Sequence, residues 1–227
     1  MKLAIVIPAF NESATLAGVI DGLKLARSPQ LTTEIILVDD GSTDDTAAIR
    51  RAHGAVVLRH IINRGLGAAL ATGLLSALRR GADVIATCDA DGQHAPSDVA
   101  RAVQELLVSG ADIAIGSRML DRSGMPCSRR RANDLANLFT RIIFGVRMSD
   151  SQSGLRVFTR RAAERLRITA TNYEVSSEIC GEIGRLDLKL QEVPIQAIYT
   201  DYSLSKGQSF QVGIRTLSRL ILSRWMR

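Results

Sequence analysis

The feature that most constrains the fold is a regular alternation, in the first half of the chain, of short apolar runs with longer helical stretches. The runs are rich in branched residues, as buried strands are. They occupy residues 3–7, 34–38, 55–59, 83–88 and 112–116, and the helical stretches occupy residues 13–27, 43–52, 66–80 and 96–109. Strands separated by helices of this length form βαβ units. The pattern therefore predicts an α/β fold with a Rossmann-like, mostly parallel sheet flanked by helices.

The pattern changes after residue 117. A loop rich in Gly, Pro, Ser and Arg follows at 119–131, and then predicted helices at 133–146, 174–186 and 208–226 and strands at 155–159, 189–194 and 197–201. No repeat or linker divides the chain, so we expect a single domain over residues 1–227. Its parts are a front half at 1–117, a further unit at 118–207 and a C-terminal helix at 208–227.

Charge is distributed unevenly between the two halves. Residues 1–115 contain 10 Lys or Arg and 13 Asp or Glu, whereas residues 116–227 contain 19 and 10. The second half therefore has a basic surface suited to phosphates, to an anionic membrane or to nucleic acid. The alternative is a general preference for arginine, since the chain has 25 Arg and only 4 Lys.

Polar residues follow four of the predicted strands. Because parallel strands end at one edge of a sheet, we expect these segments to lie together where open α/β sheets bind ligands. They are Pro8-Ala9-Phe10-Asn11-Glu12, Asp39-Asp40-Gly41-Ser42-Thr43-Asp44, Asn63-Arg64-Gly65-Leu66-Gly67 and Asp89-Ala90-Asp91-Gly92-Gln93. The glycines of the third segment serve either to bend the chain or to let backbone approach a ligand.

Asp89 and Asp91 are two residues apart on an extended chain, so their side chains point the same way. Together with Gln93 they supply hard oxygen ligands for Mg²⁺ or Mn²⁺ that also holds a diphosphate. The alternative is a polar turn bent at Gly92. The three histidines, by contrast, are scattered, and we expect structural or surface roles for them.

These four segments, in this order and spacing, resemble the family 2 glycosyltransferases of GT-A fold. In the second half, Gly116-Ser117-Arg118, residues 150–156 and Ser205-Lys206 resemble the branch of the polyprenol-phosphate, or dolichol-phosphate, mannose synthases. The resemblance covers nearly the whole chain. It implies an inverting, metal-dependent enzyme that moves a hexose, expected to be mannose from GDP-mannose, onto a polyprenyl phosphate.

The resemblance also implies roles for individual residues. The residues it implies for binding the nucleotide are Pro8, Asn11, Glu12, Asp39 and Asp89. Those for the metal and the donor diphosphate are Asp89, Asp91 and Gln93. Those for the acceptor and its phosphate are Arg118, Arg131, Asn133 and Lys206, and those for the sugar pocket are Gln152, Ser153 and Gly154. Asp89, Asp91, Arg118 and Arg131 are the expected catalytic residues, and residues 118–207 become a basic acceptor-side extension. The arginine alignment is ambiguous by a residue or two within 128–131.

The residue types agree with a phosphate acceptor. A hydroxyl acceptor needs a general base, and no properly placed base is evident, whereas a phosphate monoester is mostly dianionic at pH 7 and needs none. The alternatives are a family 2 enzyme with a UDP-sugar donor such as UDP-glucose, one with a hydroxyl acceptor, and a basic protein that binds nucleotides or nucleic acid. An intact Asp89-Asp91-Gln93 set disfavours the last, so no nucleic-acid partner is expected.

The expected location is the cytosolic face of a membrane. No run reaches the roughly 18 apolar residues of a spanning helix, and three widely spaced cysteines suit a reducing compartment. An apolar stripe in 208–226, opposite Arg215 and Arg219, suits either an interfacial helix or one packed on the core. Residues 133–146 leave the same two alternatives. The protein is expected to reach its lipid by peripheral contact or through a membrane-protein partner.

Overall fold

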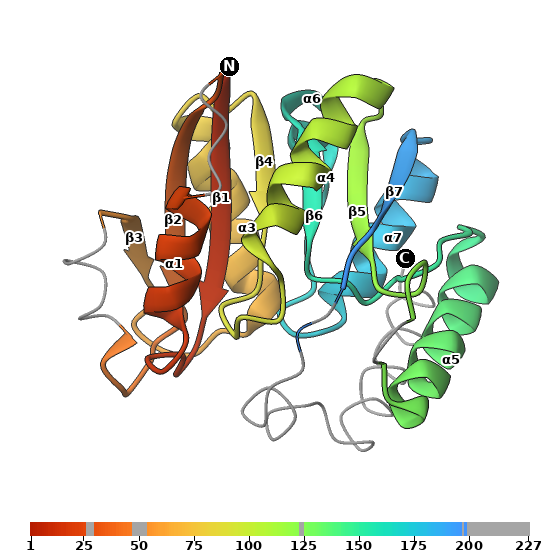
Figure 1. The fold of residues 1–227 in the computed structure, drawn as a ribbon, viewed down its shortest axis with the longest axis horizontal. Coiled ribbons are helices and arrows are strands. Elements are labelled where there is room, and N and C mark those ends of the chain that lie inside the picture. The colour runs from red at the N-terminus through yellow and green to blue at the C-terminus, as the bar shows by residue number, and fades with distance from the viewer. Residues whose placement is uncertain (26–29, 47–53, 123–124, 197, 199–227) are drawn as a thin grey trace.

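The computed structural model describes residues 1–25, 30–46, 54–122, 125–196 and 198. Its centre is a seven-stranded sheet in the order β3-β2-β1-β4-β6-β5-β7, shown in Figure 1. All strands run parallel except β6, which is antiparallel to β4 and β5. The strands are β1 (Lys2–Ala9), β2 (Thr32–Asp39), β3 (Val56–Arg59), β4 (Val84–Thr87), β5 (Ile113–Ser117), β6 (Arg156–Thr159) and β7 (Leu190–Pro194). The predicted mostly parallel α/β sheet is confirmed.

Helices cover both faces of this sheet. They are α1 (Leu16–Leu25), α3 (Leu66–Arg79), α4 (Pro96–Ser109), α5 (Cys127–Phe144), α6 (Arg160–Arg165) and α7 (Val175–Arg185). Figure 1 shows α1 and α4 on one face, α3, α6 and α7 on the other, and α5 at the margin of the molecule. Within the described residues no helix combines the length and hydropathy that crossing a bilayer requires.

Alternation of side chains along the strands divides the core into two layers. Leu3 and Ile5 of β1 join the apolar cluster under α1 and α4, whereas Ala4 and Val6 join the cluster under α3. On the second side the helix approaches closely, because a β-carbon at Gly73 of α3 would overlap the side chain of Val6. Both faces are thus buried, which is why these strands read as continuous apolar runs.

The antiparallel strand β6 determines what lies at the carboxyl edge of the sheet. Its first residue, Arg156, pairs with Thr87 at the end of β4. The segment that leads into β6, residues 149–155, therefore lies at the edge where the parallel strands end. The Thr87 hydroxyl donates a hydrogen bond of 2.8 Å to the carbonyl of Gly154 and fixes this segment there.

The structure differs from the predicted elements in two places. Helix α5 begins at Cys127, whereas the helix was predicted from residue 133, because Pro126 supplies the φ of an N-cap ahead of an arginine-rich first turn. Helix α6 was not predicted; its N-cap Thr159 accepts a hydrogen bond from the amide of Ala162. Most of the predicted helix at 43–52, most of the strand at 197–201 and all of the helix at 208–226 lie outside the described residues.

Near the amino ends of β1 and β2, Lys2, Glu34 and Arg80 form an ion-pair cluster whose contribution to stability depends on pH. Hydrogen bonds from Arg80 lower the pKa of Glu34 from 4.5 to about 2, and Lys2 adds to this effect. A carboxyl group with a lowered pKa in the folded state stabilises the protein above its unfolded pKa. That contribution is lost as the pH falls from about 4.5 to about 2.

We therefore expect Glu34→Gln to lower the Tm by about 2 °C at pH 7. The difference from the wild type should disappear as the pH falls below 4.5 towards 2. Thermal denaturation followed by circular dichroism checks this. Glu164→Gln, which removes an exposed partner of Arg160 on α6, serves as the control and should leave the Tm unchanged; a pH-independent effect of Glu34→Gln would contradict the assignment.

Candidate active site

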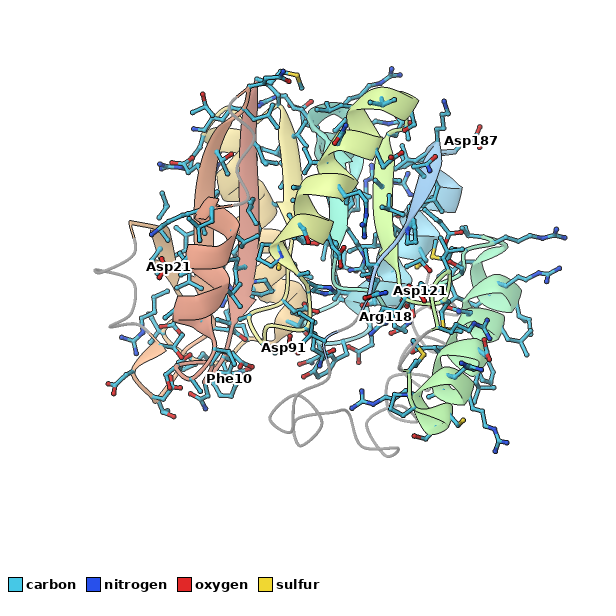
Figure 2. All side chains as sticks on the ribbon, in the orientation of Figure 1. Phe10, Asp21, Asp91, Arg118, Asp121 and Asp187 are labelled. Carbon is cyan, nitrogen blue, oxygen red and sulfur yellow. The ribbon has the colours of Figure 1, made fainter. Side chains whose placement is uncertain are left out.

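The predicted site segments meet at the carboxyl edge of the sheet. Residues 10–12 follow β1, residues 40–44 follow β2, residues 88–93 follow β4, and Arg118 follows β5. Figure 2 shows Phe10, Asp91 and Arg118 towards this edge, and Asp187 at the opposite edge. The expectation that polar strand ends gather in one place is confirmed for the described residues.

Asn11 and Asp39 fix the backbone of the first two segments. Asn11 adopts a φ of 55°, a conformation that Asn tolerates better than most residues. Its side-chain oxygen accepts from the amide of Thr43 at 2.9 Å, and its own amide donates to Ser42 Oγ at 3.0 Å. Asp39, fully buried, accepts from the amide of Ser42 at 2.9 Å. The ends of β1 and β2 thus form one rigid wall.

Asp40 and the glycine segment connect this wall to α3. The carboxylate of Asp40 accepts from His60 Nδ1 at 2.5 Å and from the amides of Arg64 and Gly65 at 3.0 and 2.7 Å. His60 is therefore structural, as predicted.

The amino terminus of α3 contacts the chain itself. The amides of Gly67 and Ala68 donate to the carbonyl of Thr171 at 2.8 and 3.2 Å. A β-carbon at Gly67 would overlap the carbonyl of Ala170. Close packing of the chain, which was not among the two roles considered, accounts for Gly67, whereas the φ of 93° at Gly65 agrees with the expected bend.

Asp89 and Asp91 follow β4 and differ in their electrostatic surroundings. Burial raises the pKa of Asp89, but the hydrogen bond from His94 Nε2 at 3.2 Å and the charges of Arg156 and Arg118 outweigh it, so that the pKa is lowered. Burial raises the pKa of Asp91, and the negative charge of Asp89 raises it further. The two carboxylates therefore repel each other.

A divalent cation would relieve this repulsion. The described residues contain no cluster of three or more His, Cys, Asp or Glu side chains with metal-binding geometry. Mg²⁺ and Mn²⁺ that bind diphosphates require only one or two carboxylates, because the phosphates and waters supply the other ligands. The paired carboxylates of Asp89 and Asp91 fit such an ion. The backbone N–H of Gln93 donates to Asp91 Oδ1 at 2.9 Å and holds the carboxylate of Asp91 in place.

Gly154 lies directly against the first carboxylate. A β-carbon at this position would overlap all three atoms of the Asp89 carboxylate. The carbonyl of Gly154 is held by Thr87, so the backbone cannot easily retreat. Glycine at 154 therefore determines where the Asp89 side chain lies.

On the other side of the site, Arg118 is held by Asp150. The Nε and one Nη of Arg118 donate to the two carboxylate oxygens at 2.7 and 2.8 Å, and its amide donates to Oδ2 at 3.1 Å. The Asp150 side chain is fully buried and that of Arg118 is 16% exposed. A bidentate pair of this kind fixes the plane of the guanidinium group.

The remaining predicted residues fall into three groups. Gln152 and Ser153 lie in the 149–155 segment beside Gly154, and the buried Ser153 Oγ has no hydrogen-bond partner among the described residues. Arg131 and Asn133 are on α5, where Arg131 is exposed and the Asn133 amide lies 3.9 Å from the sulfur of Met119. Lys206 lies outside the described residues.

Sequence reasoning missed three residues of this region. His94 was expected to be structural or at the surface, but it bonds Asp89; its place directly after Gln93 was the available signal. Asp150 had no assigned role although it holds Arg118. Arg156 is only 2% exposed and its charge acts on Asp89. A charged residue at the start of a predicted strand was the signal for it.

We expect Gly154→Ala to weaken Mn²⁺ binding about tenfold, because the added methyl group displaces the Asp89 carboxylate. Free Mn²⁺ can be measured by electron paramagnetic resonance during a titration. Gly18→Ala on α1, where a β-carbon would meet nothing within 4 Å, is the matched control and should bind as the wild type. Equal affinity of both variants would show that the Gly154 contact does not position Asp89.

Comparison with known proteins agrees with the resemblance seen in the sequence. The chain is 42% identical over 228 residues to an uncharacterized protein of Methanocaldococcus jannaschii, covering 98% of this chain and 92% of that protein. It is 32% identical to the UDP-N-acetylglucosamine–dolichyl-phosphate N-acetylglucosaminyltransferase of Methanococcus voltae, covering 96% and 94%. It is 31% identical to the undecaprenyl-phosphate mannosyltransferase of Micrococcus luteus, covering 99% and 94%.

Solved structures agree on the fold. Glucosyl-3-phosphoglycerate synthase from Mycobacterium tuberculosis, in complex with Mn²⁺, UDP and glucosyl-3-phosphoglycerate, superposes with a TM-score of 0.76 at 24% identity, covering 98% of this chain and 79% of that one. The predicted GT-A fold is thereby confirmed. The family model described as glycosyl transferase family 2 matches residues 4–167. The protein therefore belongs to glycosyl transferase family 2.

Proposed function

We propose that the protein is an inverting hexosyltransferase that moves a hexose from a nucleotide sugar to a polyprenyl or dolichyl phosphate. The observation that carries this proposal is the meeting, at one sheet edge, of the Asp89–Asp91 pair with an arginine held by Asp150. The first suits a diphosphate leaving group and the second a phosphate nucleophile. Two relatives that match over nearly their whole length are named as transferases to lipid phosphates.

The donor's nucleoside would bind at the ends of β1 and β2. Pro8, Asn11, Glu12 and Asp39 are the residues that we assign to it. Support comes from the rigidity of this wall and from Asp39, whose Oδ2 is buried without a hydrogen-bond partner among the described residues. A buried acceptor of this kind suits a base or ribose donor group. Arg59 Nε lies 3.2 Å from it as a counter-charge.

Asp89, Asp91 and Gln93 would hold Mg²⁺ or Mn²⁺ together with the donor diphosphate. When bound, the ion supplies neutralisation of the negative charge that develops on the leaving group. The chain's own contribution is to aim the two carboxylates: Gly154 and His94 position Asp89, and the amide of Gln93 positions Asp91. The mycobacterial synthase of the same fold contains Mn²⁺ with UDP.

The acceptor phosphate would approach from the side of Arg118. A phosphate monoester is largely dianionic at pH 7 and attacks without a general base, so orientation is the main requirement. Arg118 can orient the phosphate because Asp150 fixes the plane of the Arg118 guanidinium group. We assign Arg131, Asn133 and Lys206 to further phosphate contacts.

Between donor and acceptor, Gln152, Ser153 and Gly154 would contact the hexose. Displacement from the side opposite the leaving group inverts the anomeric centre.

We further propose that the enzyme works at the cytosolic face of a membrane through peripheral contact or a membrane-protein partner. The lipid acceptor requires such contact. The second half of the chain, with 19 basic and 10 acidic residues, suits an anionic lipid surface. Membership of an enzyme family disfavours the alternative of a nucleic-acid-binding protein.

Loss of a metal-binding carboxylate should abolish transfer. We expect Asp91→Asn to lower kcat for transfer to a polyprenyl phosphate at least about 100-fold, since one ligand of the ion is lost. The rate at which radiolabelled lipid-linked sugar is formed measures this. Asp187→Asn, an exposed change at the opposite edge of the sheet (Figure 2), is the control. Full activity of Asp91→Asn would refute the metal assignment.

The donor expected from the sequence resemblance is GDP-mannose. Relatives at similar identity are named for transfer of N-acetylglucosamine, mannose and glucose, so the comparisons favour none of them. A thermal-shift screen with Mn²⁺ and GDP-mannose, UDP-glucose or UDP-N-acetylglucosamine separates these donors. We expect the largest rise in Tm with GDP-mannose; a larger rise with either UDP-sugar would replace that donor.

A further inference from the structure

Helix α5 has an outer face that the rest of the described chain does not cover. Among its 18 residues only Thr140 is buried. Leu135, Leu138 and Ile142 are 51%, 50% and 69% exposed. With the exposed Arg131 they follow the spacing i, i+4, i+7 and i+11, which places all four on one side of a helix. We call these four residues the outer stripe.

Hydrogen bonds and ring packing away from the stripe hold the helix in this orientation. Asn137 donates to the carbonyl of Ser149 and accepts from the amide of Ser151 at 2.8 Å. Near the carboxyl end, Phe144 packs so closely on α7 that a β-carbon at Gly181 would lie 2.7 Å from its ring. The helix cannot roll to bury Leu138 and Ile142 without breaking both contacts.

The outer stripe is mechanically connected to the acceptor side of the site. The segment that Asn137 binds, residues 149–151, includes Asp150, which in turn fixes Arg118. Arg131, assigned to the acceptor phosphate, is itself a member of the stripe. A surface that contacts the outer stripe therefore lies next to the place where a lipid phosphate would enter.

We propose that the outer stripe of α5 docks on a phospholipid bilayer with anionic headgroups. This inference rests on the proposed function, because a polyprenyl phosphate acceptor resides in a bilayer. Charge selects this occupant: the helix contains four arginines, at 129–131 and 141, and one acidic residue, Asp134. A basic helix with an exposed apolar side is the pattern of an interfacial helix. A second copy of this chain would carry the same positive charge and repel it.

The test is vesicle binding by the full-length protein. The variant Leu138→Gln/Ile142→Gln replaces two of the three apolar residues of the stripe without changing charge. We expect it to lower co-sedimentation with phosphatidylglycerol–phosphatidylcholine vesicles about tenfold. The matched control, Leu107→Gln/Val108→Gln, alters two exposed apolar residues at the end of α4, on the opposite edge of the sheet. It should bind as the wild type. Unchanged binding of the α5 variant overturns the proposal.

Two further measurements identify other occupants. Light scattering without lipid would show a smaller oligomer for the α5 variant if a second copy covered the stripe. If the α5 variant had a lower Tm than the wild type but bound vesicles equally well, residues 199–227 of the same chain would be the segment that covers the stripe. Either result overturns the proposal; an unchanged mass and Tm, together with lost vesicle binding, support it.

Transfer assays separate this inference from the proposed function. A water-soluble short-chain polyprenyl phosphate needs no bilayer, so wild type and α5 variant should use it at equal rates. With a long-chain acceptor embedded in vesicles, the α5 variant should transfer sugar more slowly than the wild type. Failure of the wild type on both acceptors would refute the proposed function, whereas equal rates of wild type and variant on both would refute the docking surface alone.

Discussion

The antiparallel pairing of β6 between β4 and β5 is the constraint on which the site depends. A parallel strand in this position would begin at the far edge of the sheet, and the 149–155 segment would lie there with it. Because β6 runs the other way, Asp150, Ser153 and Gly154 lie beside the ends of β4 and β5. The contact between Gly154 and the Asp89 carboxylate, and that between Asp150 and Arg118, both follow from this one reversal.

Opposed charges organise the two sides of the site differently. On the side that we assign to the donor, His94 and nearby arginines lower the pKa of Asp89, whereas burial and the charge of Asp89 raise the pKa of Asp91. Such a pair favours binding of a cation that removes the conflict. On the other side, the charge of Arg118 is already matched by Asp150, so this pair contributes orientation more than net attraction. Further positive charge comes from the arginines of α5 and from the buried Arg156, whose charge acts on Asp89.

The sequence predicted the sheet and its site edge well because both follow from local patterns. Strand runs followed by Asn11, Asp39 and Asp89 specify parallel βαβ units and the place where their ends meet. The reversal of β6 had no such signal, since an isolated four-residue strand reads the same in either direction. Helix α5 was placed six residues late because three consecutive arginines resemble a loop. Its exposed leucines could not be distinguished from core residues, since periodicity reports a face and not what covers it. The closure of α3 by Thr171 depends on a contact between residues about 100 positions apart in sequence, which no local pattern encodes.

Several of the contacts that hold the side we assign to the acceptor lie within residues 118–151, and Glu192 of β7 adds hydrogen bonds to Ser149. Arg118, Asn137 and Asp150 bind one another's segments through side chains, whereas the wall formed by β1 and β2 depends on Asn11 and Asp39 binding the backbone of 42–43. Within the part of the chain that the structure describes, Gly154 lies against Asp89 and Thr87 binds its carbonyl, so the 149–155 segment is joined to the end of β4. The consequence is that substitutions within 118–151 can reshape the side we assign to the acceptor while the contacts that join the ends of β1 and β2 stay in place.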